Sequence, residues 1–237
     1  MLKAVLFDLD GTLTDSAPVV TQTLAATMRE LAGVDRPASA YRKYLGPPLQ
    51  ESFRDLGIPD DDVHTFVVEY RRRYSLVGDR TQLFAGVTDL LRDVRAEGLG
   101  LALATSKFQH TAREVCERLD IAQYFHALCG DITEKNLFGK SEVVEMALNA
   151  LAEQGIVETG AGLADQLPAR TFRDDVLMVG DRIFDIEGAG RHRVRTVLVE
   201  WADSWPGERE QAWATVSSPG ELLELIREVR KKRILGE

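Results

Sequence analysis

Carboxylate side chains recur in this chain directly after short apolar runs. Asp8 and Asp10 follow the first run, and Asp181 and Asp185 follow the fourth. Carboxylates that meet in one cleft repel one another unless a cation neutralises them, and hard oxygen ligands select Mg²⁺. The sequence therefore predicts a magnesium site, provided that these runs end at a common edge of the fold.

Donors suited to an anion follow other elements. Thr105 and Ser106 come after the second apolar run, and Lys140 is placed to open a helix. A threonine hydroxyl, a backbone amide and an ammonium all bind phosphate oxygens. An aspartate can form a covalent aspartyl-phosphate, and the spacing of Asp8 and Asp10 lets one attack phosphorus while the other moves protons. Each motif alone is common in turns, so their joint occurrence in this order carries the prediction of phosphoryl transfer.

The elements that must position these residues alternate between two kinds. Helical spacing joins Val87, Leu90, Leu91 and Val94, and Gly98 stands where a glycine would end that helix. Such helices alternating with buried strands predict an α/β fold with a doubly wound parallel sheet, in which ligands bind beyond the carboxyl ends of the strands. The expected strands are Lys3–Leu9, Leu99–Ala104, Ala127–Cys129, Val176–Val179 and Thr196–Val199.

One stretch breaks the alternation. Between Ser16 and about Leu83 the patterns are helical, with one apolar face of Val20, Leu24, Met28 and Leu31 and another of Val63, Val67, Tyr70 and Tyr74. We expect an all-helical cap over residues 16–83, inserted into a core made of residues 1–15 and 84–237. Gly78 and Gly86 can absorb backbone rotation where the cap rejoins the core, so we expect the cap to open and close.

Composition excludes several classes of protein. The 237 residues are 44% apolar and carry a net charge of −9, which argues against nucleic-acid binding. No apolar run approaches the ~18 residues of a membrane span, and Asp8 interrupts the first apolar stretch as no secretory signal would. Cys116 and Cys129 do not suggest a disulfide framework, so we expect a cytoplasmic protein. The oligomeric state is not readable from the sequence.

The motifs together resemble a known family. Asp8-Leu9-Asp10-Gly11-Thr12-Leu13-Thr14-Asp15-Ser16 is similar to the first motif of the haloacid dehalogenase superfamily, and Thr105, Lys140 and Gly180-Asp181…Asp185 resemble its second, third and fourth. The resemblance covers nearly the whole chain and looks closest to the phosphoglycolate-phosphatase-like branch. The segment from Gly46 to Phe53 is similar to a cap segment found there and in related nucleotidases.

The resemblance implies a role for each matching residue. Asp8 would be the nucleophile, Asp10 the general acid/base, and Thr105 and Lys140, with the Ser106 amide, would hold the phosphoryl group. Mg²⁺ would bind the Asp8 carboxylate, the Asp10 backbone carbonyl and Asp181, while Asp185 would act behind them through water or Lys140. The implied activity is a Mg²⁺-dependent phosphatase for a small phosphorylated metabolite. Candidates for substrate specificity are Gly46, Pro47 and Gln50, with Tyr44 and Arg54 as further possibilities.

Alternatives and departures remain open. A phosphosugar mutase would share the core and the cap, but no histidine follows shortly after Asp15 as in the sugar mutases. A non-catalytic binding protein would have lost Asp8 or Asp10. Arg193 stands where relatives usually have glycine, and a positive φ there would cost on the order of 1 kcal/mol. Residues Ala161–Arg173 look like part of an insertion near the pocket rim.

Overall fold

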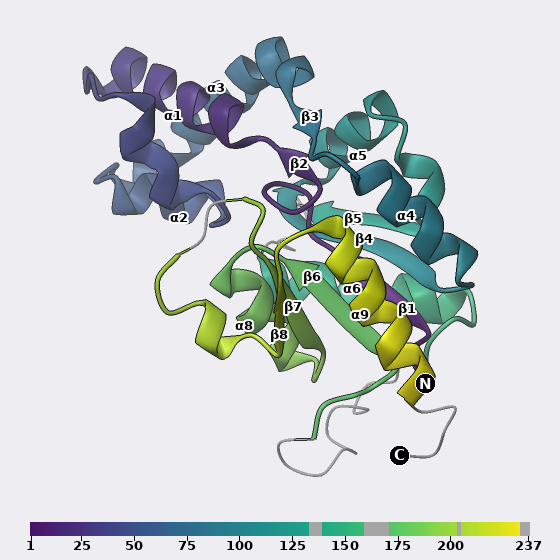
Figure 1. Cartoon of the computed structure of the whole chain (residues 1–237). Coiled ribbons are helices and arrows are strands. Elements are labelled where there is room, and N and C mark those ends of the chain that lie inside the picture. Colours follow the sequence, from purple (N-terminus) through teal and green to yellow (C-terminus); the bar gives the residue numbers. More distant parts are fainter. Residues whose placement is uncertain (133–138, 159–170, 203–204, 233–237) are drawn as a thin grey trace.

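Six parallel strands form the central sheet of the computed structural model, which describes residues 1–132, 139–158, 171–202 and 205–232 (Figure 1). The strand order is β5-β4-β1-β6-β7-β8, so the chain adds strands on one side of β1 and then crosses to the other. Such a reversal leaves a crevice beyond the carboxyl end of β1, where ligands bind in open sheets. The strands are β1 (Ala4–Phe7), β4 (Gly100–Phe108), β5 (Ala127–Asp131), β6 (Val176–Gly180), β7 (Arg195–Val199) and β8 (Ala214–Val216).

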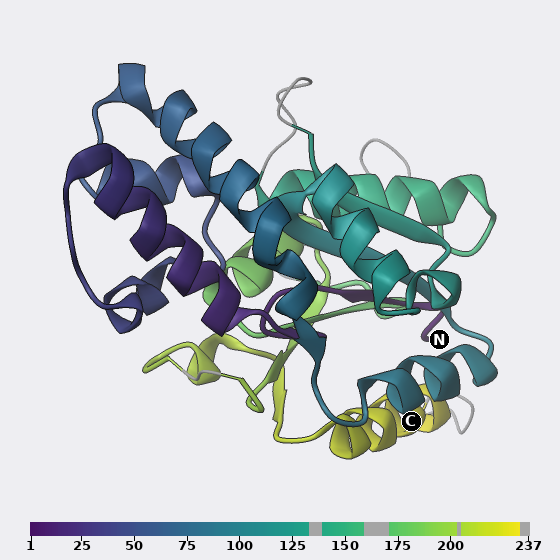
Figure 2. The ribbon, with the colours of Figure 1, turned by 90° about the horizontal axis from the view of Figure 1, so that it is seen from above.

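Helices cover both faces of this sheet, as Figure 2 shows from above. Val5 and Phe7 of β1 pack toward α4 (Val87–Ala96), α5 (Gln109–Arg118) and α9 (Pro219–Lys232). Ala4 and Leu6 pack toward α6 (Lys140–Glu153) and α8 (Ile183–Arg191). Alternate side chains of a strand point to opposite faces, so a strand buried on both faces is apolar throughout. The predicted doubly wound α/β fold is confirmed.

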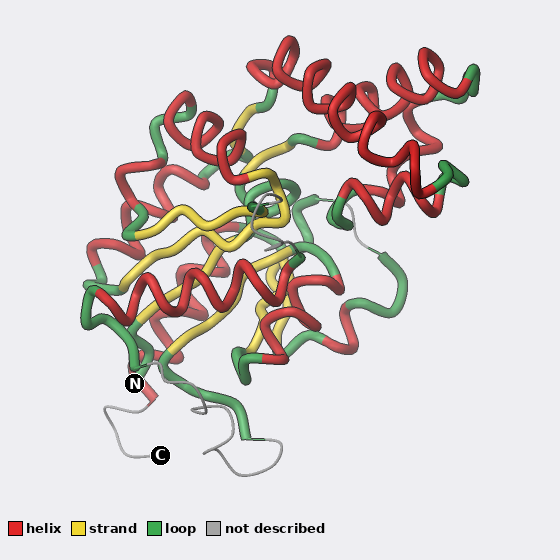
Figure 3. The backbone as a smooth tube through the Cα atoms, turned by 180° about the vertical axis from the view of Figure 1, so that it is seen from behind, coloured by secondary structure: helices red, strands yellow, loops and turns green. Residues whose placement is uncertain are grey.

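The segment 16–83 lies beyond the carboxyl ends of the strands (Figure 1), and its helices stand apart from those that flank the sheet when the molecule is seen from behind (Figure 3). It contains α1 (Ala17–Ala32), α2 (Leu49–Asp55), α3 (Asp60–Val77) and the 3₁₀ turns η1 (Ala38–Tyr44) and η2 (Gly78–Arg80). Leu24, Met28, Tyr41, Phe53 and Val67 belong to a hydrophobic cluster of this segment that is separate from the two clusters flanking the sheet. Burial of this separate cluster holds the helices together.

A two-stranded antiparallel sheet joins the two ends of this segment. It pairs β2 (Thr14–Asp15) with β3 (Gln82–Leu83), in the registers Thr14–Leu83 and Asp15–Gln82. The sequence analysis did not predict this sheet, because strands of two residues are too short to show a periodicity.

The predicted strands are confirmed, although β1 is shorter than the expected Lys3–Leu9 and β5 extends two residues beyond Cys129. Two differences are larger. Strand β4 continues to Phe108, with a shift of its pairing register between Ala104 and Phe108. Residues 105–107 therefore lie inside the strand, whereas the sequence placed them after its end. β8 was not predicted, since it has only three residues. The expected apolar face of α1 is wrong at Leu31, which is 39% exposed near the end of the helix.

Arg193 has a φ of +58°, as expected for a position where glycine is usual. Its carbonyl accepts a 2.8 Å hydrogen bond from the Arg173 amide, which ties this turn to the start of β6. Most of the expected insertion over Ala161–Arg173 lies outside the described residues. Within the described part of the chain, no helix is both long and apolar enough to span a bilayer.

Candidate active site

Lys140 connects three parts of the site. It is the first residue of α6, follows Gly139 at φ +100°, and its Nζ lies 2.7 Å from Asp8 Oδ1 and 2.8 Å from Asp185 Oδ1. The same ammonium donates a 3.1 Å hydrogen bond to the Ala104 carbonyl. The ammonium thus has two hydrogen bonds and one further ion pair. Although burial works against the charged form, Asp185 and Asp8 outweigh it and raise the pKa of Lys140.

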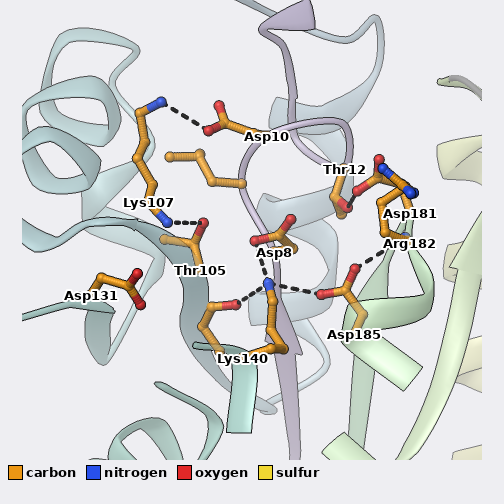
Figure 4. A network of polar contacts seen from close by, with 12 residues as sticks. Asp8, Asp10, Thr12, Thr105, Lys107, Asp131, Lys140, Asp181, Arg182 and Asp185 are labelled. Atoms are coloured by element: carbon orange, nitrogen blue, oxygen red, sulfur yellow. Dashed lines mark hydrogen bonds and ion pairs between the residues drawn. The ribbon is translucent and has the colours of Figure 1, made fainter. Parts of the chain in front are cut away.

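Three buried carboxylates lie close to one another, and two of them, Asp8 and Asp185, contact this ammonium (Figure 4). Asp8, Asp181 and Asp185 each offer an oxygen within 4.8 Å of the others, and none is more than 6% exposed. Burial, opposed in part by Lys140, raises the pKa of Asp8 to about 6. Burial, followed by repulsion from Asp185 and Asp8, also raises the pKa of Asp181. The cluster therefore holds more negative charge than Lys140 balances, and its all-oxygen donors fit a hard divalent cation.

Two glycines allow this close approach. A Cβ at Gly11, which has a φ of +85°, would lie 2.2 Å from Asp181 Oδ2, and one at Gly180 would lie 2.1 Å from Asp185 Cγ. On the other side, the Thr12 hydroxyl donates a 3.2 Å hydrogen bond to Asp181 Oδ1. The loop after β1 therefore supplies a donor to Asp181 while leaving room for its carboxylate.

The Asp10 carboxylate points away from this cluster. Its Oδ2 lies 2.8 Å from Lys107 Nζ, and its Oδ1 accepts a 3.4 Å hydrogen bond from the Thr14 hydroxyl. The structure thus brings together Asp8 and Asp181, as expected for a metal site, and adds Asp185, whose expected contact with Lys140 is direct. The metal contact expected from the Asp10 backbone carbonyl stays a prediction.

A pocket of about 800 Å³, its open mouth included, lies between the sheet edge and the segment 16–83. All the residues predicted to bind or react with phosphate line it, namely Asp8, Asp10, Thr105, Ser106 and Lys140. Gly46, Pro47 and Gln50, the candidates for specificity, line it from the helical segment, together with Tyr44. Arg54 does not line it and instead pairs with Asp60 at 2.7 Å on the surface.

Two hydroxyls in the pocket suit an anion. Thr105 is 1% exposed, and its Oγ1 accepts a 3.3 Å hydrogen bond from the Lys107 amide, so its own hydrogen is available to a ligand. The buried Ser106 Oγ has no hydrogen-bond partner among the described residues. A phosphate bound here would supply the missing acceptors.

Sequence reasoning missed several residues that line the pocket. Lys107 stood two residues after Thr105 and could have been noticed as a cation beside a predicted phosphate site. The others come from separate elements and carry no local motif; Arg71, for example, lies over the Phe108 ring at 4.1 Å. Asp131 is another such residue, and burial raises the pKa of its carboxyl to about 7. The lining residues that the sequence did not assign to the site are Val20, Leu45, Leu49, Tyr70, Arg71, Tyr74, Lys107, Phe108, Thr111 and Asp131.

The chain is similar in sequence and in structure to known proteins. The family model of haloacid dehalogenase-like hydrolases matches residues 5–199. The chain belongs to this family. The resemblance seen in its motifs is therefore confirmed.

The tyrosine-protein kinase PtkA of Mycobacterium tuberculosis is 32% identical over 84% of this chain, and the match spans 62% of that longer protein. A 5′-nucleotidase of Pseudomonas aeruginosa is 30% identical, over 82% of this chain and 81% of that protein. A predicted phosphatase from Clostridium acetobutylicum has a solved structure that superposes with a TM-score of 0.82 at 27% identity, covering 96% of this chain and all of that one. The match thus spans less than two thirds of the length of PtkA and about four fifths of the length of the 5′-nucleotidase.

Proposed function

We propose that the chain is a Mg²⁺-dependent phosphomonoester phosphatase that acts on a small phosphorylated metabolite through an aspartyl-phosphate on Asp8. The observation that carries the proposal is the environment of Asp8. Its carboxylate lines the pocket, is held by Lys140 at 2.7 Å, and belongs to a cluster of three buried carboxylates that fits a divalent cation.

The two oxygens of Asp8 have different surroundings. Oδ1 accepts from Lys140, whereas no hydrogen bond to Oδ2 comes from the described residues, so we assign Oδ2 to the attack. In the first step an Oδ2–phosphorus bond forms and the bond from phosphorus to the leaving oxygen breaks, while Asp10 gives that oxygen a proton. In the second step water attacks phosphorus, Asp10 takes a proton from the water, and inorganic phosphate leaves Asp8.

Other residues bind the phosphoryl group and the cation. Thr105 and Ser106 donate hydrogen bonds to the phosphoryl oxygens, and Lys140 reaches them by exchanging one of its present acceptors. Mg²⁺ would be held by Asp8 and Asp181 with Asp185 beside them, and when bound it would neutralise charge on the carboxylates and the phosphate.

We assign residues 16–83 to a cap that closes the pocket over the leaving group. In support, Gly46, Pro47 and Gln50 face the same pocket as Asp8, and the Arg182 guanidinium donates a hydrogen bond to the Leu45 carbonyl across the boundary between the two parts. Replacing Gly46–Phe53 by the corresponding segment of a relative should change substrate preference and leave Mg²⁺ affinity nearly unaltered. An unchanged substrate profile would contradict this role.

Phosphate release tests the proposal. Purified protein is assayed with an aryl phosphate and with a panel containing phosphoglycolate, nucleoside monophosphates and sugar phosphates, with Mg²⁺ and with a chelator. We expect Mg²⁺-dependent release that Asp8→Asn abolishes and that Asp89→Asn, a change at an exposed aspartate paired with Arg92, leaves intact. No turnover on any substrate would refute the phosphatase, and isomerised sugar phosphate without net phosphate release would identify a mutase.

The expected cellular setting follows from two features. Cys116 and Cys129 are both buried and free, which suits a reducing cytoplasm. The net charge of −9 suits a small phosphorylated substrate better than a nucleic acid as partner.

A further inference from the structure

Lys107 and Asp10 form an ion pair in the wall of the pocket. The two charged atoms, Lys107 Nζ and Asp10 Oδ2, are 2.8 Å apart, and the Lys107 side chain is only 8% exposed. Both residues line the pocket that contains Asp8 (Figure 4). From this geometry we infer that Lys107 is a positioning residue that fixes the Asp10 carboxylate for proton transfer, and that the helical segment completes the arrangement through Tyr74. The inference rests on the proposed role of Asp10 as general acid/base.

Each oxygen of the Asp10 carboxylate has its own partner. Lys107 holds Oδ2, and the Thr14 hydroxyl donates to Oδ1 at 3.4 Å. The longer bond to a neutral hydroxyl is the weaker of the two, since charge-assisted hydrogen bonds are shorter and stronger. Lys107 therefore provides most of the restraint on the carboxylate. A general acid that is fixed in the productive orientation lowers the barrier to proton transfer, because no orientational entropy is lost in the reaction step.

Lys107 is in turn held from the other side of the pocket. Its Nζ lies 4.1 Å from the centre of the Tyr74 ring, which belongs to α3 of the helical segment. A cation over the face of an aromatic ring is attracted to it, and more strongly where water is excluded. The ring covers the ammonium while Asp10 supplies the negative charge.

The Tyr74 ring is itself fixed in place. Its hydroxyl lies 3.3 Å from Thr81 Oγ1, and a Cβ at Gly78 would come within 2.7 Å of the ring, so glycine leaves the space that the ring occupies. The Gly78 and Thr81 carbonyls both accept hydrogen bonds from Arg118 of the core. The packing of the helical segment against the core thus fixes the position of the Tyr74 ring. The ring holds the Lys107 ammonium, which in turn holds the Asp10 carboxylate.

A different role for Lys107 would be direct contact with the substrate. The two roles are distinguished by how the effect of a Lys107 substitution on kcat depends on the leaving group of the substrate. An alkyl phosphate needs a proton on its leaving oxygen, whereas an aryl phosphate with a good leaving group needs it far less. Loss of a positioned acid lowers kcat mainly on alkyl phosphates, while loss of a substrate contact or of folding affects both substrates alike.

The chain offers a matched control. Lys43 pairs with Asp55 at 2.8 Å and lies 4.8 Å from the Tyr44 ring, but its side chain is 58% exposed and does not line the pocket. Lys107→Met and Lys43→Met therefore remove the same kind of ion pair, the first in the wall of the pocket and the second on the surface behind Tyr44, whose ring lines the pocket. Lys107→Arg keeps the charge, and Asp10→Asn gives the effect expected when the acid itself is lost.

The experiment measures kcat and KM for an alkyl and an aryl phosphate with Mg²⁺ present. General acid catalysis is typically worth ~10²–10⁴ in rate, so we expect Lys107→Met to lower kcat about tenfold or more further on the alkyl than on the aryl substrate. Lys107→Arg should recover part of that difference, and Lys43→Met should show none. Tyr74→Leu should shift the same ratio in the same direction as Lys107→Met, and by more than Tyr74→Phe, which keeps the ring.

The outcomes separate the inference from the proposed function. Absence of turnover in the wild type would refute the proposed function and this inference with it. Selective loss on the alkyl substrate in Asp10→Asn but equal losses on both substrates in Lys107→Met would overturn the inference alone. A rise in KM on both substrates with kcat unchanged would assign Lys107 to substrate binding instead. If Lys107→Met does not fold, as judged by thermal melting, the ratios for Lys107→Arg and Tyr74→Leu decide, and unchanged ratios in both overturn the inference.

Discussion

The Lys140 ammonium and the Asp8 carboxylate form a buried ion pair of 2.7 Å, in which Lys140 is 8% and Asp8 6% exposed. Lys140 reaches Asp185 as well, at 2.8 Å, so one cation serves two of the three clustered carboxylates. Lys140 therefore compensates the charge of Asp8 and Asp185, whereas for Asp181 the favourable effect of Arg182 is larger than that of Lys140.

Removing that cation should destabilise the fold. Lys140→Met leaves buried carboxylates uncompensated, which typically costs about 3–5 kcal/mol. Urea denaturation in the presence of a chelator measures the loss. Adding Asp185→Asn to Lys140→Met should recover part of it, because one of the stranded charges is then neutral. Equal stability of Lys140→Met and the wild type would contradict the assigned compensation.

Asp181 is expected to oppose folding until a metal ion binds. Its pKa is raised by burial and by Asp185 and Asp8, so Asp181→Asn should stabilise the metal-free protein at neutral pH and raise its Tm. The same change should remove most of the stabilisation that Mg²⁺ gives the wild type. Thermal melting with a chelator and with Mg²⁺ tests both effects. An Asp181→Asn protein that Mg²⁺ stabilises as much as the wild type would exclude Asp181 as a ligand.

Asp131 should make stability depend on pH. Burial raises the pKa of this carboxyl to about 7, well above its unfolded value of 3.8. The folded state then binds its proton more tightly than the unfolded state, so the contribution of Asp131 is fully present below pH 3.8 and is lost as the pH rises toward 7. The slope is at most about 1.4 kcal/mol per pH unit.

The variant Asp131→Asn isolates this effect, because an amide oxygen can still accept the 2.9 Å hydrogen bond from the Gly139 amide. Its stability relative to the wild type should increase between about pH 5 and about pH 8 in urea denaturation. The exposed Asp89→Asn should show no such trend. Parallel stability curves for Asp131→Asn and the wild type would mean that the carboxyl is not held neutral.

Arg193 should carry backbone strain. With a φ of +58°, Arg193→Gly is expected to be about 1 kcal/mol more stable than Arg193→Ala, since both remove the long side chain and only glycine adopts this conformation readily. Chemical denaturation of the two variants measures the difference. If Arg193→Ala were the more stable of the two, backbone strain would not be the dominant effect.

The sequence predicted those parts of the molecule that local patterns encode. Buried strands such as β1 and β6 are continuous apolar runs, and Asp8 and Asp181 directly follow them. Lys140 opens helix α6, and the fold brings these three residues to one edge of the sheet. These features depend on a few neighbouring residues, and the structure agrees with them. Arg193 was singled out by the resemblance instead, because relatives usually have glycine at that position, and its φ of +58° agrees.

Other features depend on contacts between distant segments. Nothing near Lys107 in the sequence indicates that Tyr74, in another helix, covers its ammonium, or that Asp10 turns toward it instead of toward Asp181. The strands β2, β3 and β8 are too short for a periodic signal and form only where a partner strand is present. Leu31 fits the helical spacing of α1 but belongs to the last turn of the helix, where the side chains are exposed.

The central claim is that Asp8 carries the phosphoryl group during turnover. The most direct test quenches the reaction with acid during steady-state turnover of a phosphomonoester and locates the phosphorylated residue by mass spectrometry after borohydride reduction, which converts an aspartyl-phosphate to homoserine. We predict modification at Asp8 in the wild type and none in Asp8→Asn. A phosphoryl group on any other residue, or sustained turnover by Asp8→Asn, would contradict the account.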